Sequence, residues 1–286
     1  MVGASSHPLA GIVEWVNERD LYYKTDLLAP GAPAPAGPEW IRVDRLPERV
    51  PELIDTLTEH SCQGHRTASS AFLAADMGRQ VMTLAAMAAY LTGRAPLLAA
   101  HLLWVRRTET GRLDRLTLRL SDAAVLPGDP LAHAPGVRVL ESEAELDRWF
   151  VSSAAAALEP AIAAVRATTR FGARPQWSMV ADALHEALLL ASEEVGADQA
   201  DAWERARRMV ACLNHDRDRV APRQRPFPLA LRGRPRHRPE RMFLVSGGCC
   251  FYYRFGDAKC ASCPLSSDED RERALRGHYE APTQPA

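Results

Sequence analysis

Residues 67–92 read TASSAFLAADMGRQVMTLAAMAAYLT, and this apolar, alanine-rich stretch decides the fold of the chain. Its large apolar side chains recur at the three- and four-residue spacing of a helix, at Phe72, Leu73, Met77, Val81, Leu84, Met87 and Leu91. Gly93 follows directly, and glycine at this place ends many helices because it readily adopts the left-handed conformation. The pattern predicts one long, largely buried helix.

We expect this helix to pack inside a protein and not to cross a membrane. Its apolar run, residues 81–91, is well short of the roughly 20 residues that a membrane-spanning helix needs. Asp76 and Arg79 lie just upstream of that run. The prediction is therefore that this helix is no transmembrane segment.

Strand patterns follow the helix along the chain. Residues 98–106, 113–120 and 137–140 are rich in apolar side chains, and Leu116, Leu118 and Leu120 alternate with polar neighbours. Glu109-Thr110-Gly111 offers a turn between the first two segments. These segments predict a small antiparallel sheet in the first half of the chain.

Helical periodicity resumes in the second half. It covers residues 143–168, with Pro160 as an expected break, and then residues 176–194 and 199–213. We predict an α+β fold that is predominantly α-helical. Its two regions are residues 1–140, which are mixed and carry the sheet, and residues 141–286, which are helical and end in a cysteine-rich module.

That module gathers four of the six cysteines of the chain, Cys249, Cys250, Cys260 and Cys263. Cys62 and Cys212 lie far away in sequence, which is not the spacing of a disulfide-stapled secreted domain. Residues 1–7 also lack the basic and apolar regions of a secretory signal peptide. We expect thiolates in a reducing compartment and a cytoplasmic protein.

Four thiolates suit zinc or an iron–sulfur cluster. Cys260 and Cys263 have the spacing of a zinc knuckle, but the adjacent Cys249 and Cys250 do not. Neighbouring side chains on an extended strand point to opposite faces, so this pair needs an unusual backbone, which Gly247-Gly248 could supply. A [2Fe–2S] cluster spreads its ligands over two metals, which favours the cluster over zinc.

The cysteine pair, followed by Cys260-Ala261-Ser262-Cys263-Pro264-Leu265, resembles the FhuF-type ferric-siderophore reductases over residues 246–265. Nine residues separate Cys250 from Cys260, where the family has about ten. The resemblance implies a [2Fe–2S] cluster on the four cysteines that passes single electrons to siderophore-bound Fe(III). Hard oxygen ligands prefer Fe(III), so reduction to Fe(II) lets the metal leave.

The reductase implied by this resemblance needs an external electron donor such as a ferredoxin, because the chain has no glycine-rich dinucleotide motif. Arg236, His237 and Arg238 are candidate contacts of the ferric siderophore, by their proximity in sequence to the cysteines. They belong to an arginine-rich connection, residues 216–241, which forms either a basic rim for an anionic partner or a solvated loop.

Nucleic acid is not an expected partner, because the formal charge of the 286-residue chain is −1 and no binding motif is present. Two other classes of function remain open. The chain could be an iron–sulfur electron carrier or sensor without a siderophore substrate, or a zinc-knuckle interaction module. No second metal site is expected from the two Cys-x-x-His pairs, Cys62 with His65 and Cys212 with His215. A structural role is expected for His101, His185, His237, Trp104, Trp149 and Trp177.

Overall fold

The computed structural model describes residues 7–19, 24–232, 240–256 and 258–280. Its α-helices are α1 (Ala10–Glu18), α2 (Leu46–His60), α3 (Arg66–Thr92), α4 (Glu143–Thr169), α5 (Ala173–Val195), α6 (Gln199–Leu213) and α7 (Asp268–Tyr279). Its strands are β1 (Lys24–Leu28), β2 (Trp40–Arg42), β3 (Arg94–Pro96), β4 (Leu103–Arg107), β5 (Leu113–Arg119), β6 (Ala123–Val125), β7 (Val137–Val139), β8 (Arg225–Ala230) and β9 (Glu240–Val245). Three short 3-10 turns accompany them, η2 (Val43–Arg45), η3 (Ala100–Leu102) and η4 (Tyr252–Arg254).

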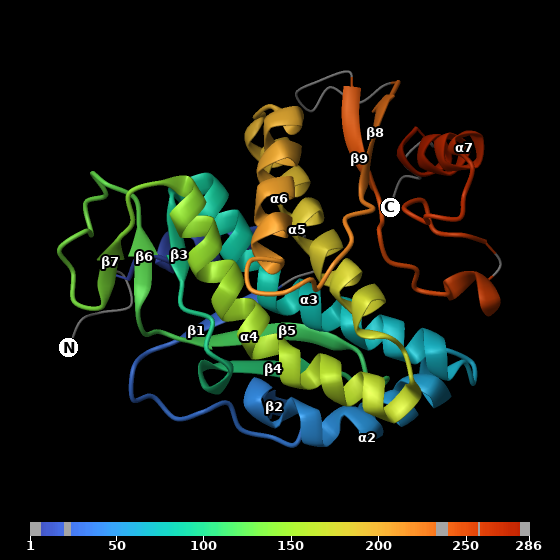
Figure 1. The fold of residues 1–286 in the computed structure, drawn as a ribbon, viewed down its shortest axis with the longest axis horizontal. Coiled ribbons are helices and arrows are strands. Elements are labelled where there is room, and N and C mark those ends of the chain that lie inside the picture. Colours follow the sequence, from blue (N-terminus) through green and yellow to red (C-terminus); the bar gives the residue numbers. More distant parts are fainter. Residues whose placement is uncertain (1–6, 20–23, 233–239, 257, 281–286) are drawn as a thin grey trace.

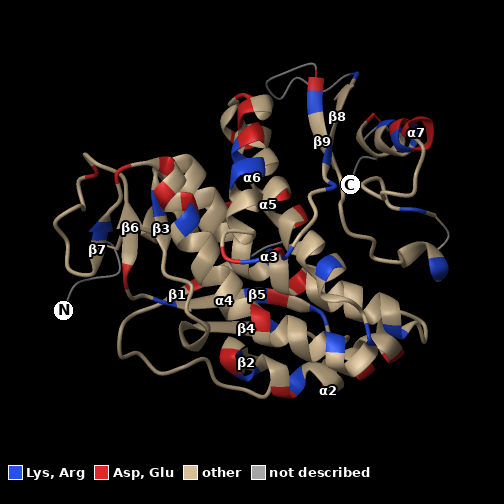
Figure 2. Ribbon diagram, viewed as in Figure 1, with Lys and Arg blue, Asp and Glu red and all other residues tan. Residues whose placement is uncertain are grey.

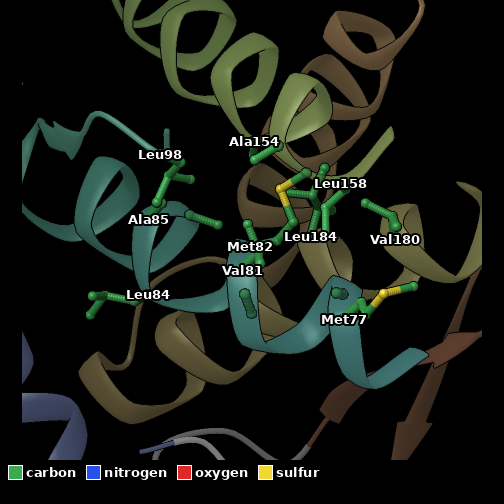
Figure 3. Packing of buried hydrophobic residues seen from close by; sticks show 14 of the residues in the cluster. Met77, Val81, Met82, Leu84, Ala85, Leu98, Ala154, Leu158, Val180 and Leu184 are labelled. Atoms are coloured by element: carbon green, nitrogen blue, oxygen red, sulfur yellow. The ribbon is translucent and has the colours of Figure 1, made fainter. Parts of the chain in front are cut away.

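Helix α3 is the long, largely buried helix that its sequence predicts, and it lies at the centre of the fold. It packs against α2, α4 and α5 and against the sheet strand β5, and Gly93 ends it with a φ of 66°. Gly78 lets α5 approach closely, because a Cβ at this position would lie 2.9 Å from the Cα of Val180. Figure 3 shows the resulting core, in which Met77 and Val81 face Val180 and Leu184. One hydrophobic core thus joins residues from both halves of the chain.

The predicted antiparallel sheet is correct only in part. Strands β4 and β5 do form an antiparallel hairpin, and β2 extends it beside β4. However, β1 joins β5 in parallel, so the four-stranded sheet is mixed. Residues 137–140 do not belong to it, because β7 pairs in parallel with β6 in a separate three-stranded sheet. All three residues of β6 are buried, so its sequence lacks the alternation of apolar and polar residues that would identify it as a strand able to pair with β7.

The helices of the second half match their predicted ranges, with one correction. Helices α5 and α6 are confirmed, but the break expected at Pro160 is wrong, since α4 runs without interruption from Glu143 to Thr169. Leu158, Ala161 and Ile162 are buried on either side of the proline. Their packing holds the helix together against the loss of one backbone hydrogen bond.

By length and composition, α4 is the one helix among the described residues that could cross a membrane. Half of its apolar window is buried inside the protein, where α4 packs against α2, α3 and α6. A core helix of a soluble protein has the same properties. The fold is therefore compatible with a soluble protein.

The sequence predicts a helical region up to the end of the chain, and this prediction is wrong in one place. An antiparallel hairpin of β8 and β9 lies within the arginine-rich connection. The cysteine segment follows β9, includes η4 and leads to α7. In Figure 1 this hairpin, the cysteine segment and α7 stand together beside α5 and α6. Strand β9 contacts both helices. The cysteines are thus presented at the flank of the helical core.

Candidate functional site

Asp182, on α5, anchors the backbone immediately before the cysteine pair. Its carboxylate accepts hydrogen bonds from the backbone N–H of Gly247 at 2.7 Å and of Gly248 at 3.1 Å. The side-chain amide of Gln224 donates a third, at 2.7 Å. Burial raises the pKa of Asp182 to about 6, although these three donors oppose the shift. A buried carboxylate of the core thus fixes where the cysteine segment begins.

Both glycines lie in close contact with neighbouring side chains. A Cβ on Gly248 would lie 2.6 Å from the Cγ of Met179, and one on Gly247 would lie 2.4 Å from the amide nitrogen of Gln224. Neither glycine has a positive φ. The left-handed residue of this segment is Phe251, with a φ of 58°, directly after the cysteine pair. The unusual backbone predicted for the pair is therefore found on its C-terminal side.

Arg271, on α7, anchors the second pair of cysteines. Its side chain is buried and donates to three backbone oxygens, those of Ala261 at 2.6 Å, Cys263 at 3.0 Å and Ser266 at 3.2 Å. A charged group that satisfies three carbonyls at once holds a turn more firmly than a neutral donor would. The two halves of the cysteine segment are thus fixed from opposite sides, by α5 and by α7.

The four cysteines lie within electrostatic range of one another. The thiols of Cys250 and Cys260 hydrogen-bond, which lowers the pKa of Cys250 to about 6 and raises that of Cys260. Burial raises the pKa of Cys249, and negative charge on Cys250 and Cys263 raises it further. Cys263 is buried, whereas the other three are half-buried. All six cysteines of the chain are free thiols.

These thiols have the chemistry of a metal-binding donor set, because thiolate sulfur binds zinc and iron–sulfur clusters. The arrangement itself is not a finished metal centre. Within the described ranges, no three His, Cys, Asp or Glu side chains are arranged so that they could hold a metal ion. The donor types therefore fit the predicted cofactor, while its coordination geometry stays a prediction.

A cavity of about 720 Å³ opens beside the cysteines. It lies between α3, α5, β9, the cysteine segment and α7, and Cys250, Cys260 and Cys263 contribute to its wall. Most of the remaining wall is apolar or aromatic, made by Phe72, Ala75, Met179, Leu189, Leu190, Met242, Phe243, Leu244, Tyr252, Pro264, Leu275, His278 and Tyr279. Three of the four candidate ligands thus face a space of the size of a small-molecule site.

Two ion pairs supply charge to this cavity. Arg79, on α3, pairs with Glu186, on α5, at 3.1 Å between Nε and Oε2. Arg241, on β9, pairs with Glu193, also on α5, at 2.8 Å between Nη2 and Oε2. Each pair brings one positive and one negative charge to the wall. The ion pairs therefore give the cavity no large net charge of either sign.

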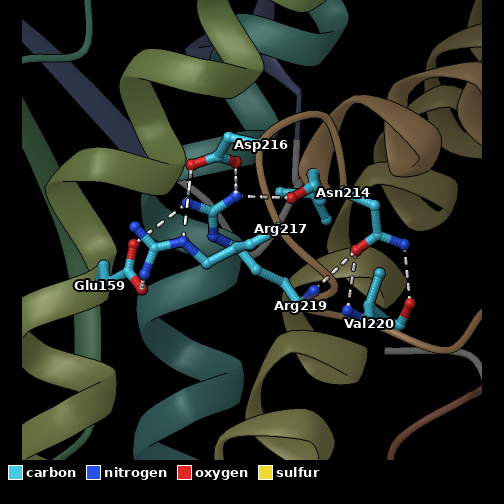
Figure 4. A network of polar contacts seen from close by, with 7 residues as sticks. Glu159, Asn214, Asp216, Arg217, Arg219 and Val220 are labelled. Atoms are coloured by element: carbon cyan, nitrogen blue, oxygen red, sulfur yellow. Dashed lines mark hydrogen bonds and ion pairs between the residues drawn. The ribbon is translucent and has the colours of Figure 1, made fainter.

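The predicted substrate contacts Arg236, His237 and Arg238 lie outside the described residues. The described part of the arginine-rich connection is mostly not a free basic rim. Arg217 and Arg219 both pair with Glu159 on α4, and Arg219 also pairs with Asp216, as Figure 4 shows. Arg219 is buried and donates to the backbone oxygen of Leu213 at 2.8 Å. These arginines fasten the end of α6 to α4.

The turn from Cys62 to His65 packs against the cysteine segment, which the sequence did not predict. The rings of His65 and Phe255 stack at 5.7 Å, and Phe72 lies 6.1 Å from the same Phe255 ring. Burial raises the pKa of Cys62, with a smaller contribution from the nearby Cys250. Burial also raises the pKa of Cys212, whose charged neighbours are different ones, Asp147 and Arg148.

The structural role expected for Trp104, Trp149, Trp177 and His185 is confirmed by their burial. Trp104 and Trp177 are buried, and Trp149 packs partly buried against the core. His185 is buried, contacts Trp203 at 4.3 Å and hydrogen-bonds through Nδ1 to Ala181 at 3.1 Å. His237 lies outside the described residues, and His101 is exposed.

Asp182 and Arg271 are the site residues that sequence reasoning missed. Asp182 is an acid within the apolar stretch WSMVADALHEALLLA, and an acid in so apolar a helix is a signal for a buried, partnered carboxylate. Arg271 stands among the charges of DEDRERALR and carries no such signal.

No protein-family model matches this chain, and no curated protein matches it.

Proposed function

We propose that this protein is a cytoplasmic ferric-siderophore reductase, in which Cys249, Cys250, Cys260 and Cys263 hold a [2Fe–2S] cluster. The observation that carries the proposal is the junction of the four-thiol segment with the 720 Å³ cavity. A structural zinc knuckle has no use for such a cavity, and a simple electron carrier needs only an exposed edge. A reductase needs both a thiol-bound redox group and a substrate site next to it.

The size and lining of the cavity support a bulky organic ligand. Its volume falls within the roughly 300–1,000 Å³ of sites that enclose small molecules. Apolar and aromatic residues form most of the wall, and its charged residues are the two ion pairs and Asp182. Because these pairs are neutral overall, the cavity favours an iron complex without a large net negative charge.

When bound, the cluster would supply single electrons. The protein's own residues hold the cysteine segment in place beside the cavity. Asp182 and Arg271 fix the two ends of the cysteine segment from α5 and α7. Cys250, Cys260 and Cys263 face the cavity, so a ligand there lies against the thiols. Phe72 and Tyr252 lie in the wall of the same cavity and add aromatic surface beside the thiols. No nucleophile or general base is needed, because the substrate iron gains an electron and loses its preference for hard oxygen ligands.

The proposal is tested on anaerobically purified protein by iron, sulfide and zinc analysis, by visible and EPR spectra, and by Fe(II) formation from a ferric hydroxamate siderophore with dithionite as reductant. Cys260→Ser and Cys263→Ser should lose the cluster and the activity, whereas the matched control Cys212→Ser should keep both. A colourless zinc protein would favour the interaction module. A cluster protein that reduces no ferric chelate would favour the electron carrier or sensor.

A further inference from the structure

The cavity beside the cysteines follows one face of α5. Asp182 binds the glycines before the cysteine pair, and Glu186, the partner of Arg79, lies about one turn further along the helix. The stretch from Asp182 to Glu193 is about 16 Å long, from the helical rise per residue. Helix α5 contributes six residues to the cavity wall, namely Met179, Asp182, Glu186, Leu189, Leu190 and Glu193. The cavity is therefore elongated, with the cysteines at one end.

Strand β9 forms a second wall and runs in the opposite direction to α5. The start of β9 is joined to the end of α5 by the ion pair of Arg241 and Glu193, at 2.8 Å. The residues just after β9, Gly247 and Gly248, are bound by Asp182, about three turns earlier on α5. Figure 1 shows β9 beside α5 and α6. Arg241 thus marks the end of the cavity that is far from the cysteines.

Helix α7 forms a third wall between the same two ends. In its first turn, Arg271 donates to the backbone oxygen of Cys263 at 3.0 Å. Its last residue, Tyr279, contacts the ring of Phe243 at 5.4 Å. The guanidinium of Arg241 lies over both rings, 4.7 Å from that of Tyr279 and 4.9 Å from that of Phe243. All three walls therefore lead from the cysteines to Arg241.

The far half of the cavity is lined mainly by apolar side chains. We name six of them the apolar channel: Leu189, Leu190, Met242, Phe243, Leu244 and Leu275. The charged residues of β9 stand at its start, Glu240 and Arg241, and Figure 2 shows the rest of the strand without charge. The backbone N–H of Met242 donates to Gln199 of α6 at 2.7 Å, so it is not offered to a ligand. The apolar channel thus provides contact area and few hydrogen bonds.

We propose that the apolar channel binds an aliphatic chain, so that the substrate is an acylated, amphiphilic ferric siderophore; this inference rests on the proposed reductase function. The iron-bearing head group lies at the cysteine end, and the chain extends between α5 and β9 toward Arg241. A chain of CH2 groups needs no hydrogen bonds, and its burial is favourable in proportion to the apolar area removed from water. A peptide or sugar extension would leave polar groups unpaired in the same place, which is costly.

The test measures the binding of redox-inert gallium(III) complexes to the purified protein by isothermal titration calorimetry. Their ligand is a linear trihydroxamate siderophore that is acylated at its one terminal amine with an acetyl, butanoyl or octanoyl chain. The complexes differ in chain length alone, and no electron transfer is involved. Each fully buried CH2 group strengthens binding by roughly fourfold, so the octanoyl complex should bind at least about tenfold more tightly than the acetyl complex.

Two variants should remove this gain. Leu190 is half-buried in the channel wall, and the indole of Leu190→Trp would fill the space of the chain. Met242→Trp narrows the channel from β9 and should act in the same way. Each variant should bind the acetyl and octanoyl complexes with nearly equal Kd, and the acetyl complex as the wild type does. The matched control is Val195→Trp, at an exposed position of α5 outside the cavity wall, which should keep the full gain.

Three results would overturn the proposal. One is equal affinity of the wild type for all three complexes, or no binding of any of them. Another is a gain with chain length that persists in both Leu190→Trp and Met242→Trp. The third is a gain that Val195→Trp also removes. A failure of the reductase function is a separate result, because it would appear as no Fe(II) from the ferric acetyl complex with the dithionite-reduced wild type, whatever the gallium complexes show.

Discussion

Asp182 of α5 accepts a hydrogen bond at 3.1 Å from the backbone N–H of Gly248, the residue directly before the cysteine pair. The same carboxylate also binds Gly247 and Gln224, so one side chain of the core determines the position of the first two cysteines. The cysteine segment is therefore not an independent appendage. Its geometry depends on α5, which packs against the central helix α3.

Asp182→Asn should loosen the cysteine segment. An asparagine amide would face one of the three donors with its own N–H groups, leaving a buried donor without an acceptor, which costs about 1–3 kcal/mol. After treatment with a chelator, iodoacetamide should modify Cys249 and Cys250 faster in this variant than in the wild type. Asp218→Asn, at an exposed position, is the control. Equal rates in all three proteins would show that Asp182 does not hold the segment.

The pKa of Asp182 predicts a pH dependence of stability. Because burial raises this pKa to about 6, above the unfolded value, the folded state binds the proton more tightly. Its contribution to stability is complete below about pH 4 and is lost as the pH rises through 6, a change of about 3 kcal/mol. In urea titrations, the free energy of unfolding of wild type relative to Asp182→Asn should fall over this range. A constant or rising difference would contradict the assignment.

Gly248→Ala should disturb the same contact by steric means. The new Cβ would lie 2.6 Å from the Cγ of Met179, and overpacking of this kind costs about 1–3 kcal/mol. In a Met179→Ala background, Gly248→Ala should cost much less than it does in the wild-type background, because the clashing atom is absent. Gly11→Ala is the control, since a Cβ at that position would meet nothing within 4 Å and should stabilise α1 by about 0.5–1 kcal/mol. An equal cost of Gly248→Ala in both backgrounds would locate the strain elsewhere.

Ala75→Trp tests whether the cavity is the substrate site. Ala75 lies on α3 in the cavity wall, and an indole there would occupy space that a siderophore needs. We expect a several-fold rise in KM for the ferric siderophore, with the cluster spectrum unchanged. Ala163→Trp places the same side chain on an exposed position of α4 and should leave KM unaltered. Wild-type KM in Ala75→Trp would exclude this cavity as the binding site.

The sequence predicts those parts of the fold that depend on local pattern. The periodicity of residues 67–92 and Gly93 predict α3, and alternation at Leu116 and Leu118 predicts the β4–β5 hairpin. Long-range partners leave no such pattern, so the pairing of β7 with β6 and the parallel partner of β5 could not be predicted. At Pro160 the local pattern predicts a break in the helix, and this prediction is wrong because tertiary packing overrides the local preference.

The candidate site also has a part that the sequence predicts and a part that it does not. Clustering in the sequence identifies the four cysteines as candidate ligands, because they lie close together along the chain. The residues that position them come from distant elements, Asp182 from α5 and Arg271 from α7. In the arginine-rich connection, clustering in the sequence is misleading. Arg219 belongs to a run of charged residues that suggests a solvated loop, but it is buried against its acidic partners. Charge composition does not reveal which charges are paired.

One anaerobic single-turnover experiment tests the proposed electron transfer from a cysteine-bound cluster to a ferric siderophore. The protein is reduced, freed of excess reductant and mixed with a ferric hydroxamate siderophore and a ferrous trap, while the cluster spectrum and Fe(II) are followed together. The proposed reductase function predicts that the cluster is reoxidised with a saturable rate and that one Fe(II) appears for each electron lost. A reducible cluster that stays reduced in the presence of the siderophore, or a protein that holds zinc and no iron, would contradict it.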